Sequence, residues 1–203
     1  MRVITGKARG VQLKTPDGMQ ARPTTDRVKE ALFSIILFDL PGKRVLDLFG
    51  GTGQLGIEAL SRGAQSAVFV DASESACRLI HENLRRARME PEGKVVRSDY
   101  LAYLERCREK FDIVFLDPPY AEVFLENALK RITEIDILQS GGIIVAERPV
   151  GKDLSMTFPG FSRSKDYKYG HTLLTIYRKD GVEASLLKLR FIPAVLIQLP
   201  ADI

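Results

Sequence analysis

The stretch FDIVFLDPPYAEV, residues 111–123, joins an apolar run to side chains that could act on a substrate. The run predicts a buried strand, and it ends in Asp117, Pro118, Pro119 and Tyr120. Proline fixes φ and pushes the residue before it toward extended geometry, so the end of this strand should be a stiff lip that holds its groups still. The alternative is an ordinary strand-to-helix turn, because Asp and Pro are common turn residues.

A glycine-rich stretch, LDLFGGTGQLG, offers a second chemical feature. Gly51, Gly53 and Gly56 match the pattern GxGxxG, in which glycines let the backbone approach a ligand at the positive end of the following helix. Asp71 ends the next predicted strand, where an acid commonly binds ribose hydroxyls. The glycine pattern and Asp71 together indicate a nucleotide-like cofactor. They do not distinguish between cofactors, because an enzyme that uses nicotinamide would show both features.

The other strand ends separate these possibilities. Asp99 follows the third predicted strand, where it could accept a hydrogen bond from an adenine amino group. A dehydrogenase needs a proton donor or acceptor near the hydride, but neither His81 nor His171 ends a strand. A dehydrogenase also has no function for a Pro-Pro-Tyr segment at the end of a strand, so an enzyme that uses a nicotinamide cofactor is disfavoured.

The elements that position these residues alternate between helix and strand from residue 25 onward. This alternation, with strands apolar on both faces, predicts an α/β fold with a parallel sheet covered by helices on both sides. Two late strands joined at Gly170 should bring an antiparallel hairpin into the sheet. Helices are predicted within 24–37, 54–63, 73–88, 100–108 and 122–137, and strands within 44–49, 66–71, 94–99, 111–117, 142–148 and 162–179.

The positive charge is concentrated at the N-terminus. Residues 1–29 hold seven basic and two acidic residues, whereas the other 174 residues hold 23 basic and 24 acidic ones. A basic arm beside a neutral body is typical of a surface that binds a polyanion, because Lys and Arg neutralise phosphates. A solvated basic tail is the alternative, but RVITGKARGVQLKT has the pattern of a short β-hairpin.

Composition excludes several other classes. Cys77 and Cys107 form neither a CxxC motif nor a disulfide framework, and no cluster of metal ligands is visible. The first residues contain no apolar signal region, and no apolar run approaches the length of a membrane span. We therefore expect a cytoplasmic protein without a metal or a membrane partner.

Several motifs together resemble one known family. LDLFGGTGQLG resembles motif I of class I S-adenosylmethionine-dependent methyltransferases, and DPPY is similar to the (D/N/S)PP(Y/F/W) motif of those that methylate exocyclic amino groups. With ITGKARGVQL, RPTTDRVKEALFSII and YKYGHTLLTIYR, they resemble the RsmD-type methyltransferases, which make N2-methylguanine in bacterial small-subunit ribosomal RNA. The resemblance covers residues 1–179; the apolar segment 181–203 departs from it and has no assigned role.

The resemblance implies a Rossmann-like class I methyltransferase fold with a mostly parallel seven-stranded sheet. It also implies roles for individual residues. S-adenosylmethionine would be the cofactor, and the acids near it have simple helix N-capping as their alternative role. Catalytic roles fall on Asp117, Pro118 and Tyr120, and cofactor contacts on Asp47 (glycine loop and methionine amino group), Gly51, Gly53, Asp71 (ribose) and Asp99 (adenine).

On the substrate side, we expect contacts with ribosomal RNA or a small-subunit particle from Lys7, Arg9, Arg22, Thr24, Thr25 and Arg27. The predicted organisation is a basic hairpin over 1–22, a methyltransferase domain over 23–180 and a tail over 181–203, in a monomer. Two other functions stay open. One is a DNA adenine-N6 methyltransferase, which would use the same DPPY chemistry, and the other is a noncatalytic nucleic-acid-binding module.

Overall fold

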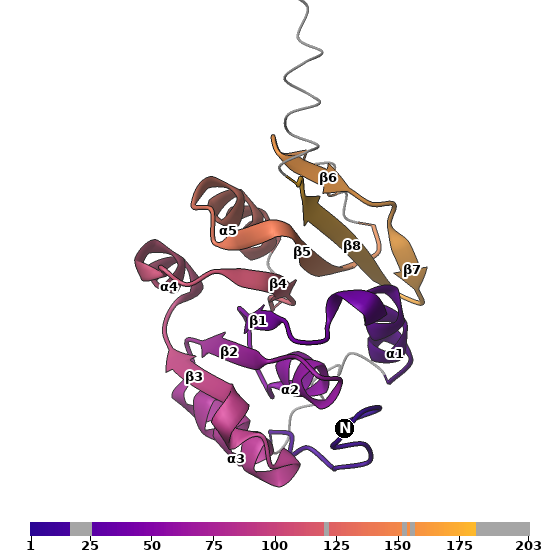
Figure 1. Ribbon diagram of the computed structural model, residues 1–203, viewed down its shortest axis with the longest axis vertical. Helices are drawn as coiled ribbons and strands as arrows, with labels where there is room; N and C mark the ends of the chain where they lie inside the picture. Colours follow the sequence, from indigo (N-terminus) through magenta and orange to yellow (C-terminus); the bar gives the residue numbers. More distant parts are fainter. Residues whose placement is uncertain (17–25, 120–121, 152–153, 155–156, 182–203) are drawn as a thin grey trace, which may run out of the picture.

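The computed structural model describes residues 1–16, 26–119, 122–151, 154 and 157–181 (Figure 1). Four of the predicted site residues, Arg22, Thr24, Thr25 and Tyr120, lie outside the described residues. Residues 182–203, nearly all of the predicted tail, also lie outside them.

A single sheet forms the centre of the molecule, with the strand order β3-β2-β1-β4-β5-β8-β6 and with β7 also paired to β8. The first five strands in this order are parallel, and β8 runs antiparallel to β5. The predicted mostly parallel sheet is therefore confirmed. The strands are β1 (Arg44–Asp47), β2 (Ser66–Asp71), β3 (Gly93–Arg97), β4 (Phe111–Leu116), β5 (Leu138–Pro149), β6 (Phe161–Arg163), β7 (Tyr167–Tyr169) and β8 (Thr172–Lys179).

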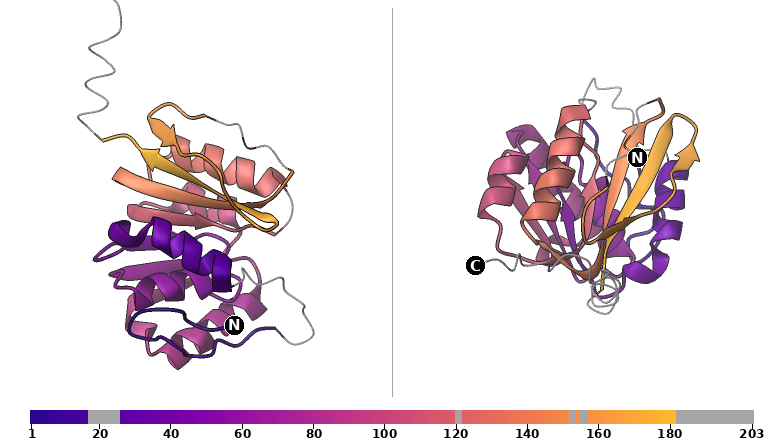
Figure 2. Two further views of the ribbon diagram at one scale, coloured as in Figure 1. Left: turned by 90° about the vertical axis from the view of Figure 1, so that its right-hand side faces the viewer. Right: turned by 90° about the horizontal axis from the view of Figure 1, so that it is seen from above.

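Helices cover both faces of the sheet, as Figure 2 shows. Successive residues of a strand point to opposite faces, so Val45 of β1 joins the core under α1, α2 and α3, whereas Leu46 joins the core under α4 and α5. None of the described helices is long and apolar enough to cross a membrane. The helices are α1 (Asp26–Ile35), α2 (Gln54–Ser61), α3 (Glu74–Ala87), α4 (Tyr100–Arg106) and α5 (Glu122–Glu134), with 3₁₀ turns η1 (Leu37–Asp39) and η2 (Glu90–Glu92).

The edge of the sheet beyond β8 is interrupted. β6 and β7 pair with opposite ends of β8, so the eight described strands fill seven positions across the sheet. Asp166 lies between β6 and β7, and its carboxylate accepts hydrogen bonds from Arg148, Arg163 and Thr175. These bonds attach the segment between β6 and β7 to β5 and β8. The predicted antiparallel hairpin at Gly170 forms between β7 and β8.

The N-terminal stretch forms the predicted hairpin. Arg2 and Gln12 make an antiparallel bridge, and the Val3 amide donates to the Val11 carbonyl at 3.0 Å. Val3 and Leu13 are buried in the same core as α1, α2 and α3. The described part of the hairpin is thus packed on the body of the domain, while the predicted boundaries at residues 22 and 180 stay predictions.

Candidate active site

The glycine loop follows β1 at the carboxyl edge of the sheet. The Gly50 amide donates to the Val70 carbonyl at 2.8 Å, which ties the loop to β2. Gly51 and Gly53 have φ values of 54° and 78°, a left-handed geometry that costs glycine little. Gly53 caps the start of α2, so the loop leads directly into the positive end of that helix.

Asp47, the last residue of β1, lies beneath this loop. Its side chain is 1% exposed, and its Oδ2 accepts a hydrogen bond from the Gly56 amide at 3.1 Å. Burial is the main reason why the pKa of Asp47 is raised to about 8; the nearby negative charges of Asp117 and Asp71 add to the rise, and the Gly56 hydrogen bond opposes it. A cation bound beside Asp47 would favour its ionised form, as expected for a partner of an amino group.

Asp71 links three strand ends. Its Oδ2 accepts from the Gly51 amide at 2.9 Å, and its Oδ1 accepts from the Ser73 amide at 2.8 Å. Its backbone carbonyl accepts from the Ser98 amide at 3.0 Å, just after β3. The sequence predicted that Asp71 binds ribose, and the structure shows that it also fixes the glycine loop. Each carboxylate oxygen has a second lone pair, which can still accept a hydrogen bond from a ligand hydroxyl.

Asp99 is the N-cap of α4. Its Oδ1 accepts from the amides of Leu101 and Ala102, at 2.9 and 3.1 Å. The capping alternative weighed from the sequence therefore applies to Asp99. It does not exclude the adenine contact, because the side chain is exposed and both capping bonds use one oxygen.

Asp117 and Pro118 follow β4, the strand beside β1. Asp47, the last residue of β1, pairs with Phe115 of β4. Asp117 therefore lies two residues beyond the level at which β1 ends. Asp117 and Pro118 are half-buried, whereas Pro119 is exposed. The predicted acid and the first proline of the lip are thus placed beside the glycine loop.

An aromatic cluster lines the same edge and was not predicted from the sequence. The Phe49 and Tyr100 rings have centroids 5.1 Å apart, and Tyr100 meets Phe124 edge-on at 5.6 Å. Phe124 is 37% exposed, and its neighbour Val123 is 65% exposed. Such a surface could receive a flat ring. The sequence held a signal for Tyr100, which directly follows the capping acid Asp99.

The glycine loop fits a bound cofactor. A side chain at Gly51 would find no atom nearer than the Phe49 carbonyl oxygen at 3.9 Å, so open space lies beside the loop. The Oε1 atom of Gln54, in the first turn of α2, is buried without a hydrogen-bond partner among the described residues. Open space and an unpaired polar atom are what a loop that binds a polar ligand requires.

Fewer basic residues of the N-terminal region are free to bind RNA than their number suggested. Lys7 pairs with Glu92 at 2.6 Å, and Lys14 pairs with Glu82 at 3.0 Å. Lys29 is fully buried 3.5 Å from Glu58, and burial lowers its pKa. Among the predicted RNA contacts that the structure describes, Arg9 and Arg27 are exposed without an ion pair to a described residue. Among the described residues, the unpaired positive surface is therefore smaller than the charge count implied.

The sheet order, the glycine loop after β1 and the acids at four successive strand ends define a class I methyltransferase fold. The family model described as "Conserved hypothetical protein 95" matches residues 1–178, and the chain belongs to this family. The predicted resemblance to RsmD-type methyltransferases is confirmed.

The chain is similar to curated and structurally characterised proteins over most of its length. It is 40% identical to "Putative rRNA methyltransferase YlbH" of Bacillus subtilis (strain 168), covering 89% of this chain and 100% of that one. It is 30% identical to "Ribosomal RNA small subunit methyltransferase D" of Escherichia coli (strain K12), covering 89% and 91%. The solved structure "Putative methyltransferase yhhF from Escherichia coli" superposes with a TM-score of 0.81 at 29% identity, covering 89% and 98%.

Proposed function

We propose that this protein transfers a methyl group from S-adenosylmethionine to the exocyclic N2 amino group of a guanine in small-subunit ribosomal RNA. The observation that carries the proposal is the position of Asp117 and Pro118, at the end of the strand beside β1 and its glycine loop. The names of the curated relatives support ribosomal RNA as the substrate class.

The cofactor would lie across the carboxyl edge, where its sulfonium supplies an electrophilic methyl group. Open space beside Gly51 leaves room for it, the left-handed backbone at Gly53 turns the loop into α2, and Asp47 would face its amino group. Asp71 would accept from the ribose hydroxyls, and Asp99 would accept from the adenine amino group. Each of these side chains lies at the end of a strand or in the loop after it, as a ligand in this fold requires.

The guanine amino group is a weak nucleophile because its lone pair is delocalised into the ring. Two acceptors, the Asp117 carboxylate and the Pro118 carbonyl, would hold its two N–H bonds and favour a pyramidal nitrogen. Both prolines fix the backbone here, so these acceptors need no reorganisation during the reaction. Bound S-adenosylmethionine would supply the methyl group to this nitrogen and leave as S-adenosylhomocysteine, and Asp117 would accept the proton that the nitrogen loses.

The target base must leave its stack to reach these groups. The exposed side chain of Phe124, next to Tyr100, supports a surface on which a flat ring could stack. Tyr120 would add a second ring by analogy with the family motif; it lies outside the described residues. On the RNA side, the exposed Arg9 and Arg27 would contact phosphates.

We infer that the protein works as a monomer in the cytoplasm, on RNA or on a small-subunit particle. A monomer is supported by the small number of large hydrophobic side chains that are exposed among the described residues. These are Leu37, Phe38, Val123, Phe124 and Val150.

Two measurements separate the proposal from its alternatives. Calorimetry should detect S-adenosylmethionine binding, whereas a noncatalytic nucleic-acid-binding module would show none. Purified protein with methyl-labelled cofactor should then label small-subunit ribosomal RNA and leave double-stranded DNA unlabelled. Labelled adenine in DNA would instead support the DNA adenine-N6 methyltransferase. Cofactor binding without any labelled nucleic acid would contradict the proposed substrate class.

A further inference from the structure

Asn83 of α3 is a fully buried amide that joins two parts of the molecule. Its Oδ1 accepts from the Lys14 amide at 2.7 Å, and its Nδ2 donates to the Lys14 carbonyl at 3.0 Å. The same Nδ2 also donates to the Thr52 carbonyl at 2.9 Å. Thr52 stands between Gly51 and Gly53, so one side chain holds both the N-terminal hairpin and the glycine loop.

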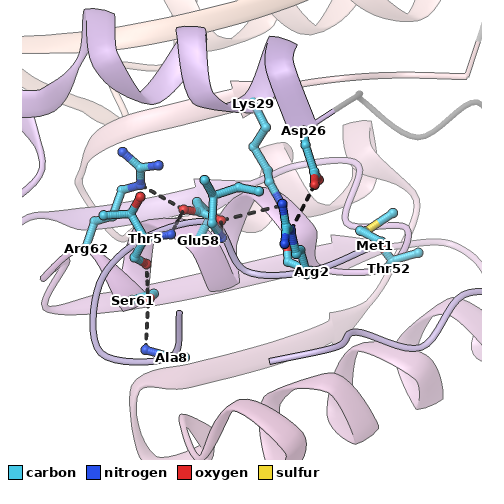
Figure 3. A network of polar contacts seen from close by, with 11 residues as sticks. Met1, Arg2, Thr5, Ala8, Asp26, Lys29, Thr52, Glu58, Ser61 and Arg62 are labelled. Atoms are coloured by element: carbon cyan, nitrogen blue, oxygen red, sulfur yellow. Dashed lines mark hydrogen bonds and ion pairs between the residues drawn. The ribbon is translucent and has the colours of Figure 1, made fainter. Parts of the chain in front are cut away.

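The other strand of the hairpin also contacts this loop. The Thr52 hydroxyl donates to Met1 Sδ at 3.5 Å, and Figure 3 shows the two side chains together. The Leu13 amide donates to the Met1 carbonyl at 3.0 Å, which joins the two hairpin strands beside the loop. The hairpin thus supports the loop from Met1 and, through Asn83, from Lys14.

Separate bonds hold the hairpin farther along α2. Buried Glu58 accepts from the amides of Ile4 and Thr5, at 2.8 and 3.0 Å. The Ser61 hydroxyl donates to the Thr5 carbonyl at 2.6 Å and accepts from the Ala8 amide at 3.0 Å, as Figure 3 shows. These bonds anchor the hairpin without contacting the glycine loop, so they provide a matched control for Asn83.

We propose that Asn83 is a positioning residue for the cofactor, and that the part of the N-terminal hairpin at Lys14 supports the cofactor loop through it. Glycines on both sides of Thr52 give the free loop a high conformational entropy. The buried amide of Asn83 restrains the Thr52 carbonyl before the cofactor arrives, so less ordering is required on binding. This inference rests on the proposed function in one respect, namely that the loop binds the cofactor.

The first test compares Asn83→Ala with Ser61→Ala. Both variants break buried bonds to the hairpin, and both should lower the melting temperature. Only Asn83→Ala releases Thr52, so its affinity for S-adenosylhomocysteine, measured by calorimetry, should fall about tenfold. The affinity of Ser61→Ala should stay within about twofold of the wild type. An equal change in the two variants, or no change in Asn83→Ala, would overturn the inference.

Kinetics give a second readout that general destabilisation would not produce. In Asn83→Ala, the KM for S-adenosylmethionine should rise while kcat on RNA stays close to that of the wild type, because Asn83 positions the loop and does not contact the acceptors after β4. A fall in kcat at unchanged KM would contradict this role.

Hydrogen exchange on the wild type decides the question if Asn83→Ala does not fold. Binding of S-adenosylhomocysteine should slow exchange of the Lys14 amide, which is bonded to Asn83, more than that of the Ala8 amide, which is bonded to Ser61. Equal slowing of both amides would overturn the inference. If the wild type does not bind S-adenosylhomocysteine at all, the proposed function fails instead.

Discussion

The Asp71 carboxylate accepts a hydrogen bond from the Gly51 amide at 2.9 Å, which joins the end of β2 to the glycine loop after β1. A second bond, from the Ser73 amide at 2.8 Å, fixes the other carboxylate oxygen. The acid proposed to bind the ribose therefore also sets the loop that admits the cofactor. These two contributions can be separated by substitution.

Replacing Asp71 should weaken cofactor binding in two steps. Asp71→Ala removes the ribose acceptor and the loop brace, so the free energy of S-adenosylhomocysteine binding should weaken by roughly 1 to 3 kcal/mol. Asp71→Asn keeps one acceptor for Gly51 and should lose less. Glu74→Gln, which alters an exposed acid of the next helix, is the calorimetric control. An unchanged affinity of Asp71→Ala for S-adenosylhomocysteine would contradict the role of Asp71 in binding the ribose.

Asp117→Ala should abolish methyl transfer and keep S-adenosylhomocysteine affinity within a few fold. The carboxylate is assigned to the amino group of the base and has no contact with the adenosyl moiety in the proposed arrangement. Asp112→Asn, at the opposite end of the same strand, is a suitable control because its carboxylate bonds the Arg44 amide. A parallel loss of cofactor binding and transfer in Asp117→Ala would refute the assignment.

Asp47→Asn should stabilise the free protein at alkaline pH. The pKa of Asp47 rises from 3.8 to about 8, so the folded protein holds a proton that the unfolded chain has lost between these values. Stability due to this group therefore falls as pH rises through the window and is lowest above about 8. The variant lacks this titration, and its free energy of unfolding should exceed that of the wild type by roughly 1 to 4 kcal/mol at pH near 9.

Urea denaturation of both proteins at several pH values measures the difference. The gap should shrink toward pH 4 and cofactor affinity should fall in the variant, because Asn cannot pair with an amino group. A difference in stability that is independent of pH would contradict the buried, titrating Asp47.

Arg9→Gln should weaken RNA binding and make its salt dependence shallower. Arg9 is exposed without an ion pair to a described residue, whereas Lys7 and Lys14 are paired with acids. Replacing Arg9 alone should lower the slope of log K against log salt by about 0.7 to 0.9, and adding Lys7→Gln and Lys14→Gln should lower it further. Arg131→Gln, near the end of α5, is a control at a basic residue outside the proposed RNA surface. An unchanged slope in the triple variant would support a merely solvated tail.

The sequence was sufficient to predict the main elements and the strand-end acids. Apolar runs with strand length predicted β1, β2 and β4, and a helical period predicted α1, in which Val28 and Leu32 are buried. Since parallel strands end at one edge of a sheet, Asp47, Asp71 and Asp117 could be grouped before their contacts were known.

Contacts between distant residues were not predictable. Lys29 counts as a surface cation in the sequence, yet it is buried because Glu58 of α2 lies opposite it. Asn83 has no local signal for its role, because its partners lie 69 and 31 residues away. In contrast, capping by Asp99 could be considered as an alternative from the sequence, because its partners follow it within three residues.

The most direct test of the account is mass-spectrometric analysis of nucleosides from small-subunit ribosomal RNA after incubation with purified protein and S-adenosylmethionine carrying a deuterated methyl group. RNA or small-subunit particles from cells that lack the gene should be used, so that the target is unmodified. The account predicts deuterated N2-methylguanosine at a single site with the wild type, and none with Asp117→Ala. Deuterated methyl groups on adenine, on the ribose or on no nucleoside would contradict it.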